Sequence, residues 1–142
     1  MNSRLSLSLL IVVASLFLSG HAGATSNYEY KPDEYMVISD GRSPDGKYSI
    51  AAHGEGELGD ENFYLYLMNA ETGKKIGTLE EVTDTLDTGA DAFYAKWSTD
   101  SREVSIRYRV DRRDARMVRY RIENGQARLL SRPAKVNDLR FK

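Results

Sequence analysis

The chain has no cysteine, only three prolines and only two histidines among its 142 residues. Without cysteine there can be no disulfide, no thiolate metal site and no cysteine nucleophile. The net charge is −1, so overall charge gives no reason to expect that the chain binds a polyanion. A Ser–His catalytic scheme would rest on His53 with no recognisable partner, and no G-x-S-x-G, H-E-x-x-H or Gly-rich phosphate-binding motif is present. We therefore expect neither enzymatic activity nor a cofactor.

The first 24 residues have the pattern of a secretory signal peptide. Arg4 precedes an apolar run over residues 5–18, and small residues then lead to an Ala-x-Ala motif ending at Ala24. The run is short for a bilayer span, and no basic stop-transfer cluster follows it, which disfavours the alternative of an uncleaved anchor. We expect cleavage after Ala24, a single domain at 25–142 without a membrane span, and a periplasmic or secreted location in a bacterium.

The first half of the remaining chain alternates β-prone segments with turn residues. Strands are predicted at 35–39, 47–53, 63–68 and 75–82, with turns at 43–46 and 69–74. Residues 63–68 are apolar at both parities, so this strand should be buried on both faces, covered on one by residues 28–30 or by another subunit. A single helical turn is possible over 80–86.

The second half follows the same plan. Strands are predicted at 92–97, 102–110, 116–122 and 127–131, with a turn at 98–101 and an Asn-Gly hairpin signal at 124–125. Matching Ser43 to Ser98 and Ile50 to Ile106 gives a repeat offset of 55 to 56 residues. The sequence therefore predicts an all-β domain of two four-stranded antiparallel units, about 35–82 and 92–131, packed as a sandwich or a partial propeller. Residues 132–142 have no firm pattern.

Two segments resemble the blades of TolB-type or WD40-like β-propellers. The first is SPDGKYSI at 43–50, followed by Tyr66-Leu67 and then ETGK at 71–74; the second is WSTDSR at 97–102, followed by Val104 and Ile106. The resemblance implies blade-like units and a scaffold for protein contacts in the cell envelope, with no universal catalytic residues. A propeller ring normally needs four or more blades. Two units therefore form a sandwich or a partial propeller, or join copies from other chains, so a homo-oligomer is one expectation.

Charge is divided unevenly along the chain. Residues 25–91 hold 5 Lys and Arg against 15 Asp and Glu, whereas residues 92–142 hold 14 against 6. If the hairpin over 102–122 pairs residue 110 with 116, Arg107 faces Arg119 and Ser105 faces Arg121. Four arginines then share one sheet face between Glu103 and Glu123: Arg107, Arg109, Arg119 and Arg121. We call these four the Arg face.

The Arg face has several possible partners. Acidic residues of the same chain or of a second copy would neutralise it, or the face is simply solvated. Alternatively it binds an anionic partner, because Arg forks suit carboxylates and phosphates: an acidic protein, glycan phosphates or lipid head groups of the envelope. Nucleic acid is not expected for a net-acidic exported chain. The leading hypothesis is an exported, non-catalytic binding or assembly module of the bacterial cell envelope.

The acidic loop over residues 54–62 supports a second hypothesis. It carries Glu55, Glu57, Asp60 and Glu61 beside His53. Such a loop could enter the basic cleft of an enzyme, as in a small periplasmic inhibitor of lysozyme type. Its carboxylates lack the regular spacing of a calcium-binding EF-hand loop, so no metal is expected. A hydrolase that uses acidic residues is the third alternative.

Overall fold

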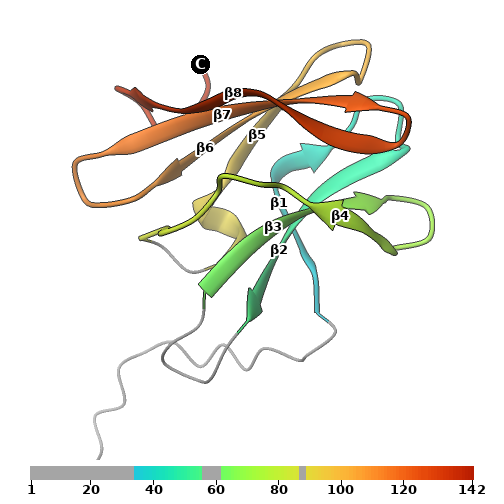
Figure 1. The fold of residues 1–142 in the computed structure, drawn as a ribbon, viewed down its shortest axis with the longest axis horizontal. Helices are drawn as coiled ribbons and strands as arrows, with labels where there is room; N and C mark the ends of the chain where they lie inside the picture. Colours follow the sequence, from blue (N-terminus) through green and yellow to red (C-terminus); the bar gives the residue numbers. More distant parts are fainter. Residues whose placement is uncertain (1–33, 56–61, 87–88) are drawn as a thin grey trace, which may run out of the picture.

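The structure is a computed structural model, and it describes residues 34–55, 62–86 and 89–142. Eight strands form a single sheet in the order β4-β3-β2-β1-β5-β6-β7-β8. The sheet curls into a half-barrel, with β5–β8 above and β1–β4 below in Figure 1. The predicted all-β class is thus confirmed. Within the described ranges, no helix has the length and apolar character needed to cross a membrane.

The first four strands form an antiparallel meander at one side of the sheet. Each pairs with the next along the chain. Their bounds are β1 Met36–Arg42, β2 Tyr48–Glu55, β3 Asn62–Asn69 and β4 Lys75–Thr78. β4 is shorter than the predicted strand at 75–82, because the chain turns inward after Thr78 and buries Leu79 and Val82.

The last four strands form a second antiparallel meander. Here too each strand pairs with the next. Their bounds are β5 Tyr94–Trp97, β6 Glu103–Arg109, β7 Ala115–Glu123 and β8 Gln126–Val136. β8 extends five residues past the predicted end at 131. The β7–β8 turn has positive φ at both Asn124 and Gly125, as a tight Asn-Gly hairpin requires.

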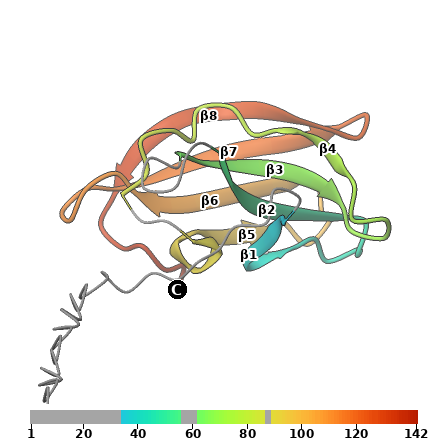
Figure 2. The same ribbon diagram turned by 90° about the horizontal axis from the view of Figure 1, so that it is seen from below.

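A parallel pairing between β1 and β5 joins the two meanders. Ser39 of β1 lies opposite Tyr94 of β5, and the Ser39 amide donates to the carbonyl oxygen of Phe93 (3.2 Å). The indole Nε1 of Trp97 donates to the carbonyl oxygen of Gly41 (3.1 Å). At the other ends of the curled sheet, β4 and β8 contact each other, and Figure 2 shows them side by side.

The two turns that suggested an internal repeat have the same geometry. In each, serine Oγ donates to the Oδ1 of the aspartate two residues on, at 2.7 Å for Ser43 and 2.6 Å for Ser98. The same Oγ accepts from the amide five residues on, and the aspartate Oδ1 accepts from the amide two residues on. The position after the aspartate has positive φ in both, Gly46 and Ser101. The turns also touch, since the Asp45 amide donates to Ser101 Oγ (3.0 Å).

The core fills the inside of the half-barrel. It combines alternate residues of both meanders with the segment that connects them: Ile38, Ile50, Phe63, Leu65, Leu67, Leu79, Val82, Phe93, Val104, Ile106, Tyr108, Val118 and Tyr120. The strand at 63–68 is buried on both faces, as predicted, because Tyr66 and Met68 are also buried on the outer side. Tyr35 packs against that outer cluster. The expected cover, residues 28–30, lies outside the described residues.

The predicted helical turn over 80–86 is wrong. Glu81 and Asp84 both have positive φ, which is incompatible with a right-handed helix. Two buried tyrosines of the opposite wall hold this segment, because Tyr108 and Tyr120 donate their hydroxyls to the carbonyl oxygens of Glu81 and Glu80. The helical turn lies further on, as a short 3₁₀ segment at Ala90–Ala92. These tertiary hydrogen bonds therefore determine the backbone conformation of residues 80–86, against the local preference for a helical turn.

Candidate partner-binding face

The Arg face exists, but its predicted register is wrong by two residues. Ser105 lies opposite Arg119, and Arg107 lies opposite Met117. The β6–β7 turn sets this register, because Asp111 Oδ1 accepts from the amides of residues 113 and 114 and closes a tight loop. A two-residue shift preserves side-chain parity, so the four arginines still share the outer face. The predicted pairing of Arg107 with Arg119 across this hairpin is therefore wrong.

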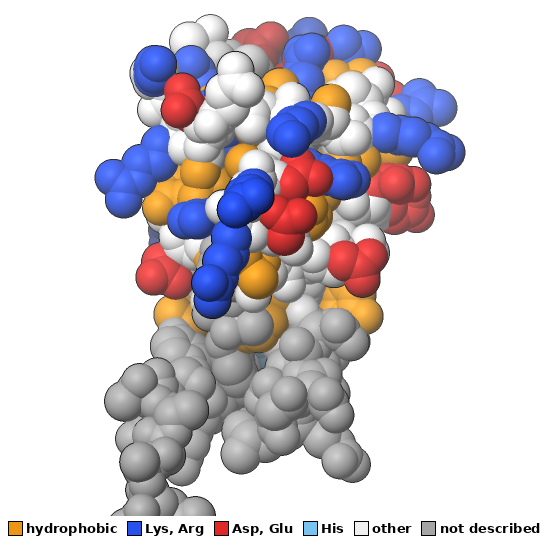
Figure 3. All heavy atoms as spheres, turned by 90° about the vertical axis from the view of Figure 1, so that its left-hand side faces the viewer, with side chains coloured by type: hydrophobic (Ala, Val, Ile, Leu, Met, Phe, Trp, Pro, Cys, Tyr) orange, Lys and Arg blue, Asp and Glu red, His pale blue; other side chains and the backbone are white. Residues whose placement is uncertain are grey.

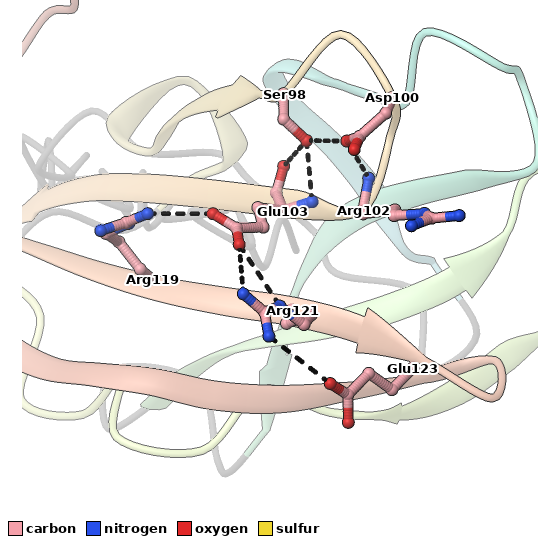
Figure 4. Close-up of polar contacts among 7 residues, drawn as sticks. All are labelled: Ser98, Asp100, Arg102, Glu103, Arg119, Arg121 and Glu123. Carbon is pink, nitrogen blue, oxygen red and sulfur yellow. Dashed lines mark hydrogen bonds and ion pairs between the residues drawn. The ribbon is translucent and has the colours of Figure 1, made fainter.

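Glu103 occupies the position opposite Arg121 and organises the centre of this face (Figure 4). Its Oε2 accepts from Nη2 of Arg119 (2.9 Å), and its Oε1 accepts from Nη2 (2.7 Å) and Nε (3.3 Å) of Arg121. Arg121 Nη1 also lies 3.8 Å from Glu123, whose other oxygen pairs with Arg128 (3.0 Å). Charges thus alternate across β6, β7 and β8.

This network orients the guanidinium groups while leaving them accessible. The side chains of Arg119 and Arg121 are both 46% exposed. The hydrogen bond from Arg121 is the main reason that the pKa of Glu103 lies below its ordinary value. The carboxylate in turn raises the pKa of the Arg121 guanidinium. Both groups are therefore charged at neutral pH, and a bound anion would meet arginines that are already positioned.

A polar hollow of about 830 Å³ opens beside this network, between the β5–β6 and β7–β8 turns. Arg102 lies at its rim, and Figure 4 shows its guanidinium pointing away from Glu103. Ser98 holds Asp100 by a short hydrogen bond, which lowers the pKa of that carboxyl. Charged residues of both signs and three uncharged residues line the hollow: Ser98, Asp100, Arg102, Glu103, Arg121, Ile122, Glu123 and Asn124.

The chain's own C-terminal residues cover Arg107. Its Nη1 donates to the carbonyl oxygens of Asp138 (3.1 Å) and Arg140 (2.9 Å). Its guanidinium carbon lies 4.1 Å from the centre of the Phe141 ring. The sequence offered no signal for this contact, because residues 132–142 have no periodic pattern. Arg109, at the end of β6, is exposed and also makes a polar or electrostatic contact.

Basic side chains gather over the β5–β8 half of the molecule. Figure 3 shows basic side chains from the top to the middle of the side that it draws, interspersed with acidic groups rather than forming a uniform patch. Besides the predicted arginines, the structure adds Arg102 and Arg128 to this surface. Arg102 lies in the β5–β6 turn, where strand parity gives no guide to side-chain direction, whereas Arg128 lies on β8 opposite Arg121. The sequence therefore identified the correct sheet face but only part of its surface.

The acidic loop of the second hypothesis is largely outside the described residues. This applies to Glu57, Asp60 and Glu61, and Glu55 is described only as the last residue of β2. The neighbouring His53 is buried at 7% exposure and stacks on Tyr35 with ring centres 4.4 Å apart. Its Nδ1 lies 2.7 Å from the Glu34 carbonyl oxygen. In the part of the chain that the structure describes, no three potential ligands cluster as a metal site.

Comparisons with known proteins do not assign a family. The chain matches no protein-family profile, no curated protein and no solved structure. The chemistry of the site therefore has to be inferred from its own geometry and charge.

Proposed function

We propose that this chain is an exported, non-catalytic binding or assembly module of the bacterial cell envelope. It contacts an anionic partner, most directly an acidic segment of another protein, through the Arg face and the adjoining hollow. In this proposal residues 1–24 are a cleaved signal peptide. The two meanders are blade-like units related to those of TolB-type and WD40-like propellers.

The observation that carries the proposal is that Arg119 and Arg121 are held in place by Glu103 and are still accessible to a partner. Each makes a charge-assisted hydrogen bond to Glu103, yet each keeps 46% of its side chain exposed. Ordering a long side chain in advance lowers the entropy lost when a partner binds. Guanidinium groups can also bind a carboxylate through two parallel hydrogen bonds. An acidic peptide is thus the simplest ligand for this face.

The unequal distribution of charge supports the same partner. The half of the chain that carries the face holds 14 Lys and Arg against 6 Asp and Glu. Such a field attracts an acidic partner and speeds its encounter, and salt should weaken the attraction.

The test measures binding of a fluorescent deca-glutamate peptide by anisotropy at low and high salt. The double variant Arg119→Gln/Arg121→Gln removes two charges from the face without creating repulsion around Glu103. The matched control, Lys47→Gln/Lys74→Gln, removes two exposed charges from turns of the first meander. We expect the first double variant to bind about tenfold more weakly or worse, since hydrogen bonds to charged groups contribute about 1.5–3 kcal/mol each. The control should bind like the wild type.

Two results would overturn this assignment. One is an equal loss of affinity in both double variants, which would indicate a diffuse charge effect. The other is no salt-sensitive binding of deca-glutamate by the wild type.

Charge reversal at Glu57 and Asp60 tests the inhibitor hypothesis separately. The assay measures inhibition of a lysozyme by the chain with and without these changes.

A further inference from the structure

The C-terminal residues 137–142 form a strap across the outer side of the second meander. The chain leaves β8 at Val136, which lies opposite Ala115 at the start of β7. The C-terminus lies above the β5–β8 layer in Figure 1 and beside β5 in Figure 2. The strap therefore crosses the strands and ends on the Arg face.

Side chains and two carbonyl groups hold the strap in place. Phe141 contacts two cations, with the Arg107 guanidinium carbon at 4.1 Å and Lys96 Nζ at 5.9 Å from its ring centre. The Arg140 guanidinium carbon lies 5.7 Å from the centre of the Tyr94 ring. Residues 137–142 belong to no strand. Because these residues are not part of a strand, detachment of the strap would break no strand-to-strand hydrogen bonds of the sheet.

The strap is a poor electrostatic match for the surface that it covers. It brings the positive charges of Arg140 and Lys142 to a face that already carries Lys96 and Arg107. Among the described residues, Lys142 pairs with Asp138 of the strap itself (3.3 Å). Within the described residues, Nε of Arg107 is buried and has no hydrogen-bond acceptor. A segment with an aromatic ring in the same place and carboxylates instead of these cations would suit the surface better.

We propose that the strap occupies the docking site for an extended acidic peptide containing an aromatic residue. In the docked state the partner's ring replaces Phe141 on Arg107 and Lys96, and its carboxylates take the place of the strap's basic groups. This inference rests on the proposed function, because it identifies the kind of partner segment and one position on the Arg face. The strap then acts as an internal competitor that lowers the affinity for weak ligands.

The experiment uses the full chain and a labelled hexapeptide, Asn-Asp-Leu-Glu-Phe-Glu, which is the strap sequence with glutamates at its two basic positions. Phe141→Ala removes the ring that holds the strap, so this variant should bind the hexapeptide about threefold to tenfold more tightly than the wild type. Adding Arg107→Gln to that variant should abolish the gain. A hexapeptide with alanine in place of phenylalanine should bind more weakly to Phe141→Ala.

Leu130→Ala is the control, because it truncates a side chain of β8 that is 38% exposed and lies outside the strap. It should leave hexapeptide binding unchanged. Equal binding by the wild type and Phe141→Ala would overturn the strap proposal, as would a gain that survives Arg107→Gln. If these results occur while Arg119→Gln/Arg121→Gln still weakens deca-glutamate binding, the proposed function stands and only the strap proposal fails. If neither probe binds, both proposals fail.

Discussion

Replacing Gly41 with alanine should destabilise the joint between the two meanders. A Cβ at this position would lie 2.7 Å from the carbonyl oxygen of Ile50 and 2.9 Å from that of Ile38. Both atoms belong to the backbone, so a side-chain rotation cannot relieve the clash. Gly41 also accepts the indole hydrogen bond of Trp97, which belongs to β5. A shift of the β1 backbone that relieved the clash would therefore disturb the hydrogen bond from Trp97 at the joint.

The expected loss is about 2 to 4 kcal/mol, from overpacking of about 1–3 kcal/mol together with one weakened hydrogen bond of about 1 kcal/mol. Gly77→Ala is the matched control, because a Cβ there would meet no atom within 4 Å and its φ is not positive. That change should stabilise the protein by up to about 1 kcal/mol, through lower entropy of the unfolded chain.

Urea denaturation followed by tryptophan fluorescence measures both effects. The chain contains a single tryptophan, so the signal reports directly on Trp97 and the joint. Gly41→Ala should lower the urea midpoint and change the emission of the folded protein, while Gly77→Ala should leave the emission as it is. If the two variants are equally stable and have the same emission, the close packing of β1 inferred at Gly41 is wrong.

Two further predictions concern the segment after β4 and the Glu103 network. Tyr120→Phe should destabilise the protein by about 1 kcal/mol in urea denaturation, because the buried hydroxyl can no longer donate to the Glu80 carbonyl oxygen; unchanged stability would mean that this bond does not anchor the segment. Glu103 has a pKa below its ordinary value of 4.5, so its stabilising contribution is complete above that pH and is lost as the pH falls through the lowered value. Stability measured from pH 7 to 3 should thus fall less steeply in Glu103→Gln than in the wild type, and identical slopes would refute the link.

Turn chemistry and alternation made much of the fold predictable from the sequence. The first of the two matching turns was predictable because Pro44 and Gly46 favour turn conformations locally. The structure adds that a serine and an aspartate cap nearby amides in both turns. The outer position of the Arg face followed from its alternation with Val104, Ile106 and Tyr108, all of which are buried. These inferences succeeded because each depends on residues close together in the chain.

The register of the β6–β7 hairpin could not be derived in the same way. A shift of two residues leaves every side chain on the same face, so burial does not distinguish the two pairings. The interactions of Asp111 with the amides of its own turn decide between them. As a result, the residue opposite Arg119 is Ser105 instead of the predicted Arg107, and the residue opposite Arg121 is Glu103 instead of the predicted Ser105.

The sequence by itself determined the all-β class, the repeated turns and the two-sided burial of β3, because local periodicity and turn chemistry encode them. Only the tertiary structure decided the parallel joint of β1 with β5, the entry of Leu79 and Val82 into the core, and the path of residues 137–142 over Arg107. These features depend on contacts between segments far apart in the chain. Their energy comes from burial and from hydrogen bonds that exist only once the sheet has curled.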